Sequence, residues 1–521
     1  MKKVSSAIDP IITVDRKAPA PLHRQIYDRY RAAIVSGALR PGQRVPSTRG
    51  LAAELGISRI PVLSAYAQLL AEGYFESRVG TGTAVSQSLP DHDVSPEPSS
   101  LRVSAGRRVP GSLAKHPSLA GPIANPPWRR GWGAFGVGQV AFEQFPFQVW
   151  NSLVTRHCRR ASVEYLDYGD PMGLKSLREA IALYLRTARG VRCEAEQVMI
   201  VSGSQQALDI CTRALLNAGS QIWMEEPGYR FARGVFALND CRVVPVPVDD
   251  EGLNVAVGIR RCGKAQAALV TPSHQYPLGF TMSASRRLQL LDWAESARAW
   301  ILEDDYDSEY RYESLPIPSL QGLDRNGRVI YIGTFSKVLF PSLRLGYLVI
   351  PSELIKRFHG VRLAMDIGPA AFSQAVLADF IREDHFSRHI RRMRLSYRER
   401  RNALLANLRS SLGSRVEVTG EQAGMHLCVF LNGIGDREIA QRAALAKLWL
   451  IPLSSSYVSG KGSRQGFILG FGSTSPEQMP GAVEKLRVAL GSGKEAVPRE
   501  LWRNEEKVAG AGNPAPAVKG F

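Results

Sequence analysis

The chain contains 521 residues, which is too many for one compact core at roughly 100–200 residues per domain. Because 44% of the residues are hydrophobic, a disordered protein and a small disulfide-stapled scaffold are excluded. Lys and Arg outnumber Asp and Glu by 66 to 48, and this surplus of +18 favours a polyanionic partner, nucleic acid before an anionic membrane.

Composition divides the chain into four zones. Residues 18–86 combine helical patterns with basic side chains, and residues 87–130 are rich in Pro, Ser and Gly, which predicts a flexible linker. Residues 131–490 alternate β-branched runs with longer helical segments and predict an α/β domain, followed by a tail over 491–521. The positive charge is densest near the N-terminus, where residues 1–90 carry 12 Lys and Arg against 6 Asp and Glu.

The N-terminal zone predicts three helices and a two-stranded wing. Apolar residues at helical spacing predict a helix over 21–36, which Gly37 ends. Ser47 begins a second, short helix, and a tight turn at 56–58 separates it from a third helix over 59–71 that Ser58 caps. After Gly73 the stretch YFESRVGTGTAVS alternates around a glycine-rich turn, as a two-stranded wing does.

The string PLHRQIYDRYRAAIVSGALRPGQRVPSTRGLAAELGISRIPVLSAYAQLLAEGYFESRVGTGTAV resembles the winged helix-turn-helix of the GntR family. This resemblance implies a DNA-binding domain. Arg59 would reach a base edge in the major groove, Ser47, Arg49 and Ser58 would hold phosphates, and Gly80 and Gly82 would let the wing approach the minor groove. The recognition helix departs from the frequent Ser-Arg-Thr-Thr-Val-Arg pattern because residues 58–63 are SRIPVL.

Two strand ends in the α/β zone carry the main chemical signal. The run VIYIGTFSK, residues 329–337, ends in Lys337, whose amine can form a Schiff base with a carbonyl cofactor at the carboxyl edge of a sheet. The run WILEDDYD, residues 300–307, presents Asp304 as a partner for a pyridinium nitrogen and Tyr306 as a partner for a ring oxygen. Taken alone, each residue also fits a solvated surface; together they favour pyridoxal phosphate.

Further candidates follow other strands. The turn after VMIV, residues 198–201, opens a helix whose N–H groups, with Ser204, suit a phosphate. Tyr229 lies in a turn from which it can stack on a ring, and Arg344 can hold phosphate oxygens.

The whole set resembles the fold-type I aminotransferases. The resemblance implies a large, mostly parallel mixed sheet with a small C-terminal subdomain, and it assigns the Schiff base to Lys337, the pyridine-nitrogen acid to Asp304, the 3′-oxygen contact to Tyr306 and ring stacking to Tyr229. Phosphate positions would fall on Gly203, Ser204, Gln205, Thr334 and Arg344. A GntR-type winged helix joined to such a domain resembles the MocR/GabR family of transcription regulators.

Two departures concern substrate binding. The aminotransferase pattern Asn-Pro-x-Asn-Pro-Thr-Gly is replaced by PSHQYPLG, so the asparagine at the ring oxygen is absent, and His274 or Gln275 is a candidate substitute. The arginine that grips a substrate α-carboxylate would fall at Ile468, which cannot pair with a carboxylate; Arg464 is a nearby cation.

These patterns favour a pyridoxal-phosphate-dependent transcription regulator without net turnover. Its effector would be pyridoxal phosphate itself or a small amine or amino acid. The alternatives are a working aminotransferase with a secondary DNA-binding domain, and a DNA-binding protein that retains an inactive cofactor fold. By resemblance we expect a homodimer that binds double-stranded DNA with repeated half-sites.

The cysteines and the hydropathy pattern restrict location and metal binding. No Cys-x-x-Cys pair occurs, so no metal site is predicted. No uncharged apolar run reaches the roughly 18 residues of a membrane span, and no signal-peptide run follows the N-terminus. We therefore expect a cytoplasmic protein with reduced cysteines, which are Cys158, Cys193, Cys211, Cys241, Cys262 and Cys428.

Overall fold

The computed structural model describes residues 12–78, 82–89, 133–160, 163–314, 317–431, 433, 435–458 and 463–491. The chain folds as two compact units, which fall within residues 1–113 and 114–521. Most of the expected linker, nearly all of the expected tail and the wing residue Gly80 lie outside the described residues.

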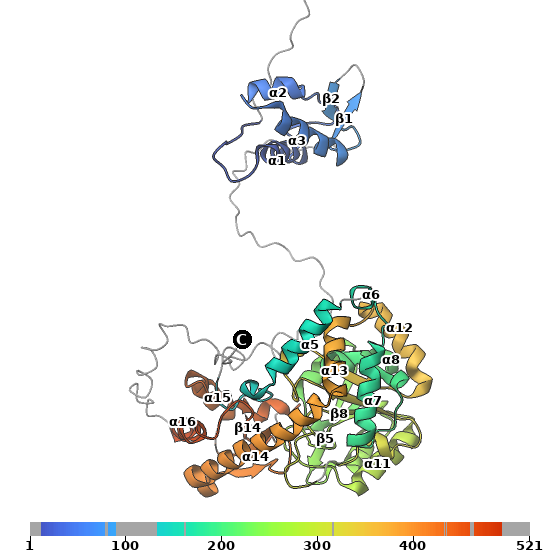
Figure 1. The fold of residues 1–521 in the computed structure, drawn as a ribbon, viewed down its shortest axis with the longest axis vertical. Helices are drawn as coiled ribbons and strands as arrows, with labels where there is room; N and C mark the ends of the chain where they lie inside the picture. The colour runs from blue at the N-terminus through green and yellow to red at the C-terminus, as the bar shows by residue number, and fades with distance from the viewer. Residues whose placement is uncertain are drawn as a thin grey trace, which may run out of the picture. The chain divides into compact units, whose positions relative to one another are not determined.

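The N-terminal unit is the expected winged helix-turn-helix (Figure 1). The spans of its helices and strands are α1 (Leu22–Val35), α2 (Thr48–Glu54), α3 (Arg59–Ala71), β1 (Phe75–Arg78) and β2 (Gly82–Val85). Ser47 caps α2 by accepting a hydrogen bond from the N–H of Gly50 at 3.1 Å. Ser58 occupies the same position before α3, but its side chain makes no capping hydrogen bond, contrary to the expectation from sequence.

Three aromatic rings hold these elements together. Tyr30 of α1, Tyr66 of α3 and Phe75 of β1 contact one another edge to face, with ring centroids 5.1–5.6 Å apart. The buried hydroxyls of Tyr30 and Tyr66 lie 3.1 Å apart, and Tyr66 also donates to the carbonyl of Pro46 at 2.9 Å. The packing therefore fixes α3 relative to α1 and to the start of the wing.

The C-terminal unit is built on an eight-stranded mixed sheet with the strand order β3-β10-β9-β8-β7-β4-β5-β6. Strands β9, β8, β7, β4 and β5 are parallel, whereas β10 runs antiparallel between β9 and β3. The spans are β3 (Val198–Val201), β4 (Gln221–Glu226), β5 (Arg242–Asp249), β6 (Gly252–Leu253), β7 (Ala267–Val270), β8 (Trp300–Asp305), β9 (Val329–Thr334) and β10 (Gly346–Val349). The expected large, mostly parallel mixed sheet is confirmed.

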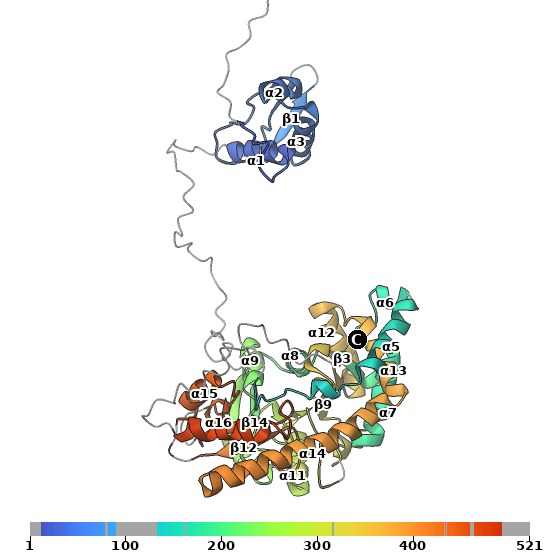
Figure 2. The ribbon, with the colours of Figure 1, turned by 60° about the vertical axis from the view of Figure 1, so that its left-hand side comes forward.

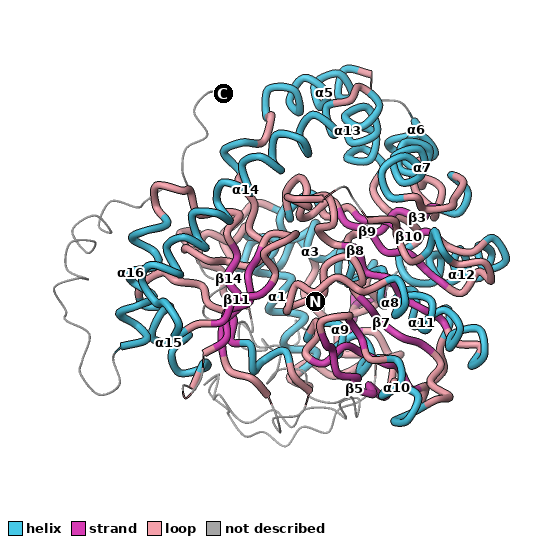
Figure 3. The backbone as a smooth tube through the Cα atoms, turned by 90° about the horizontal axis from the view of Figure 1, so that it is seen from below, coloured by secondary structure: helices cyan, strands magenta, loops and turns pink. Residues whose placement is uncertain are grey.

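Helices cover both faces of this sheet (Figure 3). One face packs against α5, α7 and α13 near β3, β10 and β9, and against α10 and α11 near β4, β7 and β8; the other face packs against α8, α9 and α12. The spans are α5 (Phe147–Arg159), α6 (Val163–Leu166), α7 (Lys175–Arg189), α8 (Ser204–Leu215), α9 (Arg230–Leu238), α10 (Val255–Cys262), α11 (Ala284–Ala297), α12 (Ile355–Asp366) and α13 (Ala371–Arg382). The strands are buried on both sides, as parallel strands usually are.

A long helix leads to a small C-terminal subdomain, as expected from sequence (Figures 1 and 2). That subdomain has an antiparallel sheet in the order β11-β12-β14-β13. The spans are α14 (His385–Leu412), β11 (Glu417–Thr419), β12 (His426–Phe430), α15 (Asp436–Leu445), β13 (Ile451–Pro452), β14 (Gly466–Gly470) and α16 (Met479–Gly491). Among the described residues, no helix is both long and apolar enough to cross a membrane.

Candidate functional site

A cavity of about 430 Å³ lies at the carboxyl edge of the large sheet. The loops that follow β3, β4, β7, β8 and β9 all contribute to its lining, because parallel strands place their carboxyl ends at the same edge. Strand β10 is antiparallel, so its beginning, next to Arg344, meets the same edge. All nine residues expected at a cofactor line this cavity: Gly203, Ser204, Gln205, Tyr229, Asp304, Tyr306, Thr334, Lys337 and Arg344.

The two carboxylates at the end of β8 have different environments. Asp305 accepts hydrogen bonds from Arg189 at 2.7 Å and from the Tyr331 hydroxyl at 2.5 Å, and these contacts outweigh burial and lower its pKa. Asp304 lines the cavity, where burial, reinforced by the neighbouring Asp305 charge, raises its pKa to about 7. Its buried Oδ1 has no hydrogen-bond partner among the described residues, so it is available to a donor in the cavity.

The phosphate-side residues are arranged around a glycine. Gly203 has φ +116°, which an L side chain rarely adopts, and a Cβ there would lie 3.5 Å from the guanidinium of Arg344. Gly203 immediately precedes α8, so the first N–H groups of this helix, the Ser204 hydroxyl and the Arg344 guanidinium border one part of the cavity. This grouping of donors suits a phosphate.

Lys337 lies against a segment that the sequence did not indicate. Its Nζ lies 2.2 Å from the position that a Cβ on Gly138 would occupy, and Gly138 has φ +80°. Residues 136–139 line the cavity, so the chain passes directly over the lysine amine.

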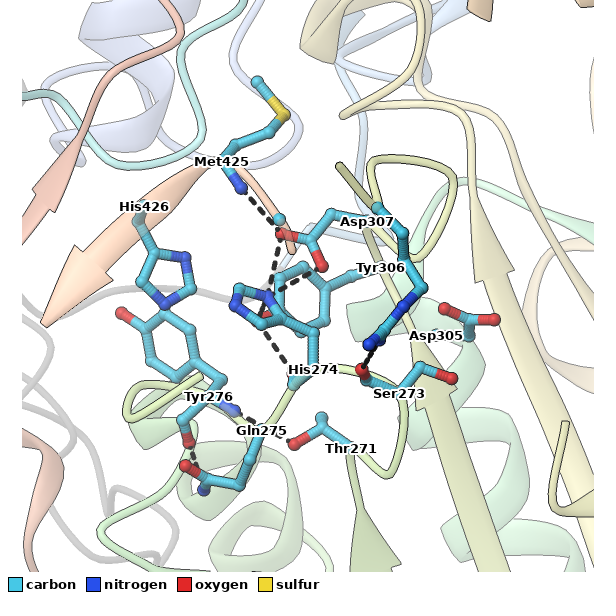
Figure 4. Close-up of polar contacts among 12 residues, drawn as sticks. Thr271, Ser273, His274, Gln275, Tyr276, Asp305, Tyr306, Asp307, Met425 and His426 are labelled. Carbon is cyan, nitrogen blue, oxygen red and sulfur yellow. Dashed lines mark hydrogen bonds and ion pairs between the residues drawn. The ribbon is translucent and has the colours of Figure 1, made fainter. Parts of the chain in front are cut away.

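Tyr306 is held by a buried network (Figure 4). Its hydroxyl donates to the carbonyl of His274 at 3.0 Å, and the Nδ1 of His274 lies 3.0 Å from Oδ1 of Asp307. Asp307 also accepts the N–H of Met425 at 3.1 Å, which ties the network to the C-terminal subdomain. Burial raises the pKa of Tyr306 well above its usual value, so the phenol stays protonated and can donate a hydrogen bond.

His426 adjoins this network but stays neutral. Burial, reinforced by the neighbouring His274 and Lys337 side chains, holds the pKa of His426 well below its usual value. Ligand atoms of His274, Asp307 and His426 all lie within 4.8 Å of one another. Because His274 and the Met425 N–H already engage the Asp307 carboxylate, we interpret the cluster as a hydrogen-bonding network.

The substitutes suggested for the absent asparagine lie elsewhere. Neither His274 nor Gln275 is part of the cavity lining, because His274 faces Asp307 and Gln275 donates to Glu225 at 3.2 Å and to the Pro227 carbonyl at 2.9 Å. The side chain that this loop contributes beside Thr271 is Tyr276. The structure therefore gives no support to His274 or Gln275 as the substitute.

The position expected for a carboxylate-binding arginine is apolar. Ile468 in β14 is fully buried between Cys428 and Ile451 of the neighbouring strands. Arg464 does not line the cavity, since it forms an ion pair with Glu417 at 2.5 Å and lies over the Phe430 ring.

Several lining residues were not found from sequence. They include Val137, Gln139, Met425, His426, Trp449 and Ile451, which come from segments without a strand-end motif, and Arg230 and Phe231, which follow β4. The signal that could have indicated Arg230 is its position next to Tyr229; the other positions carry no comparable signal.

The candidate DNA contacts that the structure describes come from the starts of α2 and α3 and from the wing. Arg49 in α2 and Arg59 at the first position of α3 are exposed, and Arg59 Nε donates to the Thr48 hydroxyl at 3.1 Å. Ser47 and Ser58 precede these two helices, and Gly82 begins β2 with φ +88°. The wing is in place, with Arg78 paired with Gly82, while Gly80 lies outside the described residues.

Comparisons with known proteins identify both parts of the chain. Residues 22–85 match the gntR family of bacterial regulatory proteins, and residues 132–486 match the class I and II aminotransferases. The aminotransferase-type unit resembles LysN, an alpha-aminoadipate aminotransferase from Thermus thermophilus that was solved in complex with N-(5′-phosphopyridoxyl)-L-leucine. The TM-score is 0.66 at 27% identity, covering 71% of this chain and 96% of that one.

A chain with these two parts is a GntR-type regulator that carries an aminotransferase-type domain. It is 41% identical over 484 residues to the probable rhizopine catabolism regulatory protein MocR of Rhizobium meliloti, covering 92% of this chain and 96% of that protein. It is also 29% identical to the pyridoxine biosynthesis transcriptional regulator PdxR of Corynebacterium glutamicum, over 92% of this chain and 99% of that one. The chain belongs to the MocR family of DNA-binding transcription regulators, which confirms the expectation from sequence.

The family implies pyridoxal phosphate as the cofactor, and the residues present fit it. The unpartnered Oδ1 of Asp304 can accept the hydrogen of a pyridinium nitrogen. Lys337 supplies an amine, and the donors around Gly203 suit the phosphate. When bound, the cofactor supplies an aldehyde that condenses with a primary amine.

Proposed function

We propose that the cavity is a sensor, and that its state sets the affinity of the winged helix for an operator. Lys337 would carry the cofactor, and Asp304 would keep its ring nitrogen protonated. Tyr306 would turn its hydroxyl hydrogen from the His274 carbonyl to donate to the ring oxygen. Tyr229 would stack on the ring, and Gly203, Ser204, Gln205, Thr334 and Arg344 would hold its phosphate. Coupling between the two sites is reciprocal, so DNA would change effector affinity by the same factor.

Ile468 is the residue that favours a sensor over an enzyme. Transamination requires that the substrate be oriented, and a buried isoleucine between apolar neighbours offers no partner for an α-carboxylate. The cationic side chains in the described lining are Arg230, Lys337 and Arg344. We therefore propose pyridoxal phosphate itself as the effector, and a small amine or amino acid held by another group as the alternative.

The aminotransferase alternative has a direct test. Incubation overnight with a panel of amino acids and a keto-acid acceptor is expected to give no more than stoichiometric conversion. Sustained turnover would show that the chain is an enzyme.

On the DNA side, we propose that Arg59 contacts a base, that Ser47, Arg49 and Ser58 contact phosphates, and that Gly80 and Gly82 bring the wing backbone to the minor groove. The DNA-binding domain would span 18–86, the linker 87–130, the cofactor domain 131–490 and the tail 491–521. Because bacterial DNA lies in the cytoplasm, we place the regulator there.

We further propose a homodimer that binds repeated half-sites. Val163, Leu166 and Tyr168 lie in or next to the short helix α6 and are 76–83% exposed, which leaves a group of large apolar side chains for a second copy to cover. Sedimentation is expected to give twice the mass of the chain, and Leu166→Glu is expected to give the monomer. A wild-type monomer at micromolar concentration would contradict this proposal.

Selection on genomic fragments, with and without pyridoxal phosphate, tests the sensor proposal. The full chain is expected to enrich fragments that share a repeated half-site, and the cofactor is expected to change the Kd for them. In Lys337→Ala the effect of the cofactor on Kd should be lost while DNA binding remains. A wild-type protein that binds pyridoxal phosphate but keeps the same Kd for DNA would overturn the proposal.

A further inference from the structure

The recognition helix α3 has an apolar surface on the side that the domain core leaves open. Ile60 is 72% exposed, Leu63 43% and Leu70 37%. The opposite side is buried in the core of the winged helix, where Val62, Ala65, Tyr66 and Leu69 lie. Positions 60, 63, 67 and 70 are three or four residues apart, so they form one face.

This face contains no charged side chain beyond the first residue of the helix. Its other exposed members are Ser64, Ala67 and Ala71. Scattered exposed aliphatic residues are ordinary, but a helix that is apolar on both sides normally has a partner on each. The inner side has its partner in α1 and β1, and the outer side is exposed.

The charges around this face favour DNA as the partner. Arg59 lies next to Ile60 in the first turn and is held by the Thr48 hydroxyl at 3.1 Å, while Arg49 is exposed in α2. Residues 12–78 and 82–89 contain ten Lys and Arg against five Asp and Glu. An apolar surface bordered by cations matches the major groove, where thymine C5-methyl groups lie between two rows of phosphates.

We propose that Ile60 and Leu63 contact thymine methyl groups and thereby set the base preference of the operator. Each half-site would carry A·T pairs at the positions that face the first two turns of α3, next to the base contacted by Arg59. This inference rests on the DNA-binding role proposed above, and it adds the chemistry that selects the sequence. The departure of residues 58–63 from the frequent GntR pattern then has a function, because apolar contacts replace polar ones.

Uracil substitution tests the proposal. A duplex obtained by selection with the full chain is remade with each thymine replaced in turn by deoxyuridine, which removes only the C5-methyl group. At one or two positions per half-site, replacement of thymine by deoxyuridine is expected to weaken binding about fourfold. This factor corresponds to roughly 0.8 kcal/mol for one buried carbon group.

A double-mutant cycle assigns each methyl group to a residue. Ile60→Ala is expected to weaken binding to the thymine duplex and to abolish the effect of deoxyuridine at one position. Leu63→Ala is expected to weaken the same binding and to abolish the effect of deoxyuridine at a second position. Both changes lie on the surface of a helix and replace the residue by a good helix former, so folding is preserved. Val35→Ala, a change at an exposed aliphatic residue of α1, is the matched control. It should alter neither the affinity for the thymine duplex nor the affinity for the deoxyuridine duplexes.

The outcomes separate this inference from the proposed function. If deoxyuridine has no effect on affinity at any position, the proposed methyl contacts are wrong while DNA binding stands. The same conclusion follows if its effect persists in both alanine variants. If Ile60→Ala leaves DNA affinity unchanged but disrupts self-association, the face binds protein and the inference is wrong. Absence of any enriched sequence from the selection would instead contradict the DNA-binding role itself.

Discussion

Asp304 and Asp305 are adjacent in β8, yet only one is available to a ligand. Consecutive residues of a strand point to opposite faces, and Arg189 lies on the face that receives Asp305. Charge and spacing in the sequence cannot distinguish the two carboxylates; the resemblance to aminotransferases selected Asp304, and the structure gives the physical reason. The partner of Asp305 is 116 residues away in the chain, which is why no local pattern predicts it.

The raised pKa of Asp304 predicts a pH dependence of stability in the cofactor-free protein. Its pKa of about 7 in the folded state exceeds the ordinary value of 3.8, so the native state holds a proton that the unfolded chain releases. The free energy of unfolding should therefore fall by roughly 3 to 5 kcal/mol on this account as pH rises from about 4 to about 7. Denaturant unfolding of Asp304→Asn should lack this component.

The same substitution should weaken cofactor binding. Loss of the charged hydrogen bond to the ring nitrogen is expected to raise the Kd for pyridoxal phosphate about 10- to 100-fold. Glu417→Gln, a change at an exposed carboxylate, is the control for both measurements. An unaltered Kd and an unaltered pH profile in Asp304→Asn would refute the role of this residue.

Gly138 predicts a steric effect at Lys337. A methyl group added by Gly138→Ala would overlap the lysine amine and would also strain a backbone with φ +80°. The rate at which the protein acquires the absorbance of covalently bound cofactor should fall roughly 10- to 100-fold, because the amine is displaced from its reacting position. Gly169→Ala, where no atom lies within 4 Å of the new methyl group, should leave this rate unchanged.

At the scale of elements, the sequence predicts the parts that follow local rules. Helix α3 begins at Arg59 and ends at Ala71, as its turn and apolar spacing indicate, with Pro61 accommodated in the first turn. Eight of the nine cofactor residues lie at or just after the ends of four parallel strands, β3, β4, β8 and β9, so the rule for strand ends brings them together; Arg344 precedes the antiparallel β10. Residues 136–139, Trp449 and Ile451 reach the cavity through long-range packing, and no periodicity in their segments indicates that.

The contacts among Tyr30, Tyr66 and Phe75 predict how strongly the start of the wing stabilises the position of α3. Phe75→Ala would remove one ring from the contacts among α1, α3 and β1, at an expected loss of roughly 3 to 5 kcal/mol. Hydrogen exchange of α3 amides in the full chain should accelerate accordingly, while that of β8 and β9 should not. Equal acceleration in both units would mean that the trio does not act locally.

At the scale of the whole molecule, the positive charge of +18 includes arginines that are buried in the fold as well as arginines that are exposed. In the described part of the C-terminal unit, eight arginines are buried, and several bind backbone carbonyls: Arg287, for example, donates to Met282, Pro272 and Pro318. Arg286 likewise donates to Gly252 and Leu253. Part of the surplus on this unit therefore holds loops together, so net charge alone overstates the surface available to DNA.

Salt dependence measures the charge that does contact DNA. With one phosphate contact from Arg49 in each of two subunits, affinity should fall about tenfold between roughly 50 and 200 mM salt. Titration of Kd against salt for wild type and Arg49→Gln should show a shallower slope in the variant. A wild-type affinity that is flat over this range would exclude phosphate neutralisation as the source of binding.

The passage of residues 136–139 over the lysine amine has a consequence for communication within the chain. These residues are among the first that the structure describes in the C-terminal unit, so the start of its described part lies against the reactive nitrogen. A group bound at Nζ is therefore expected to displace residues 136–139. The state of the lysine amine would then be expressed in the backbone position of these residues.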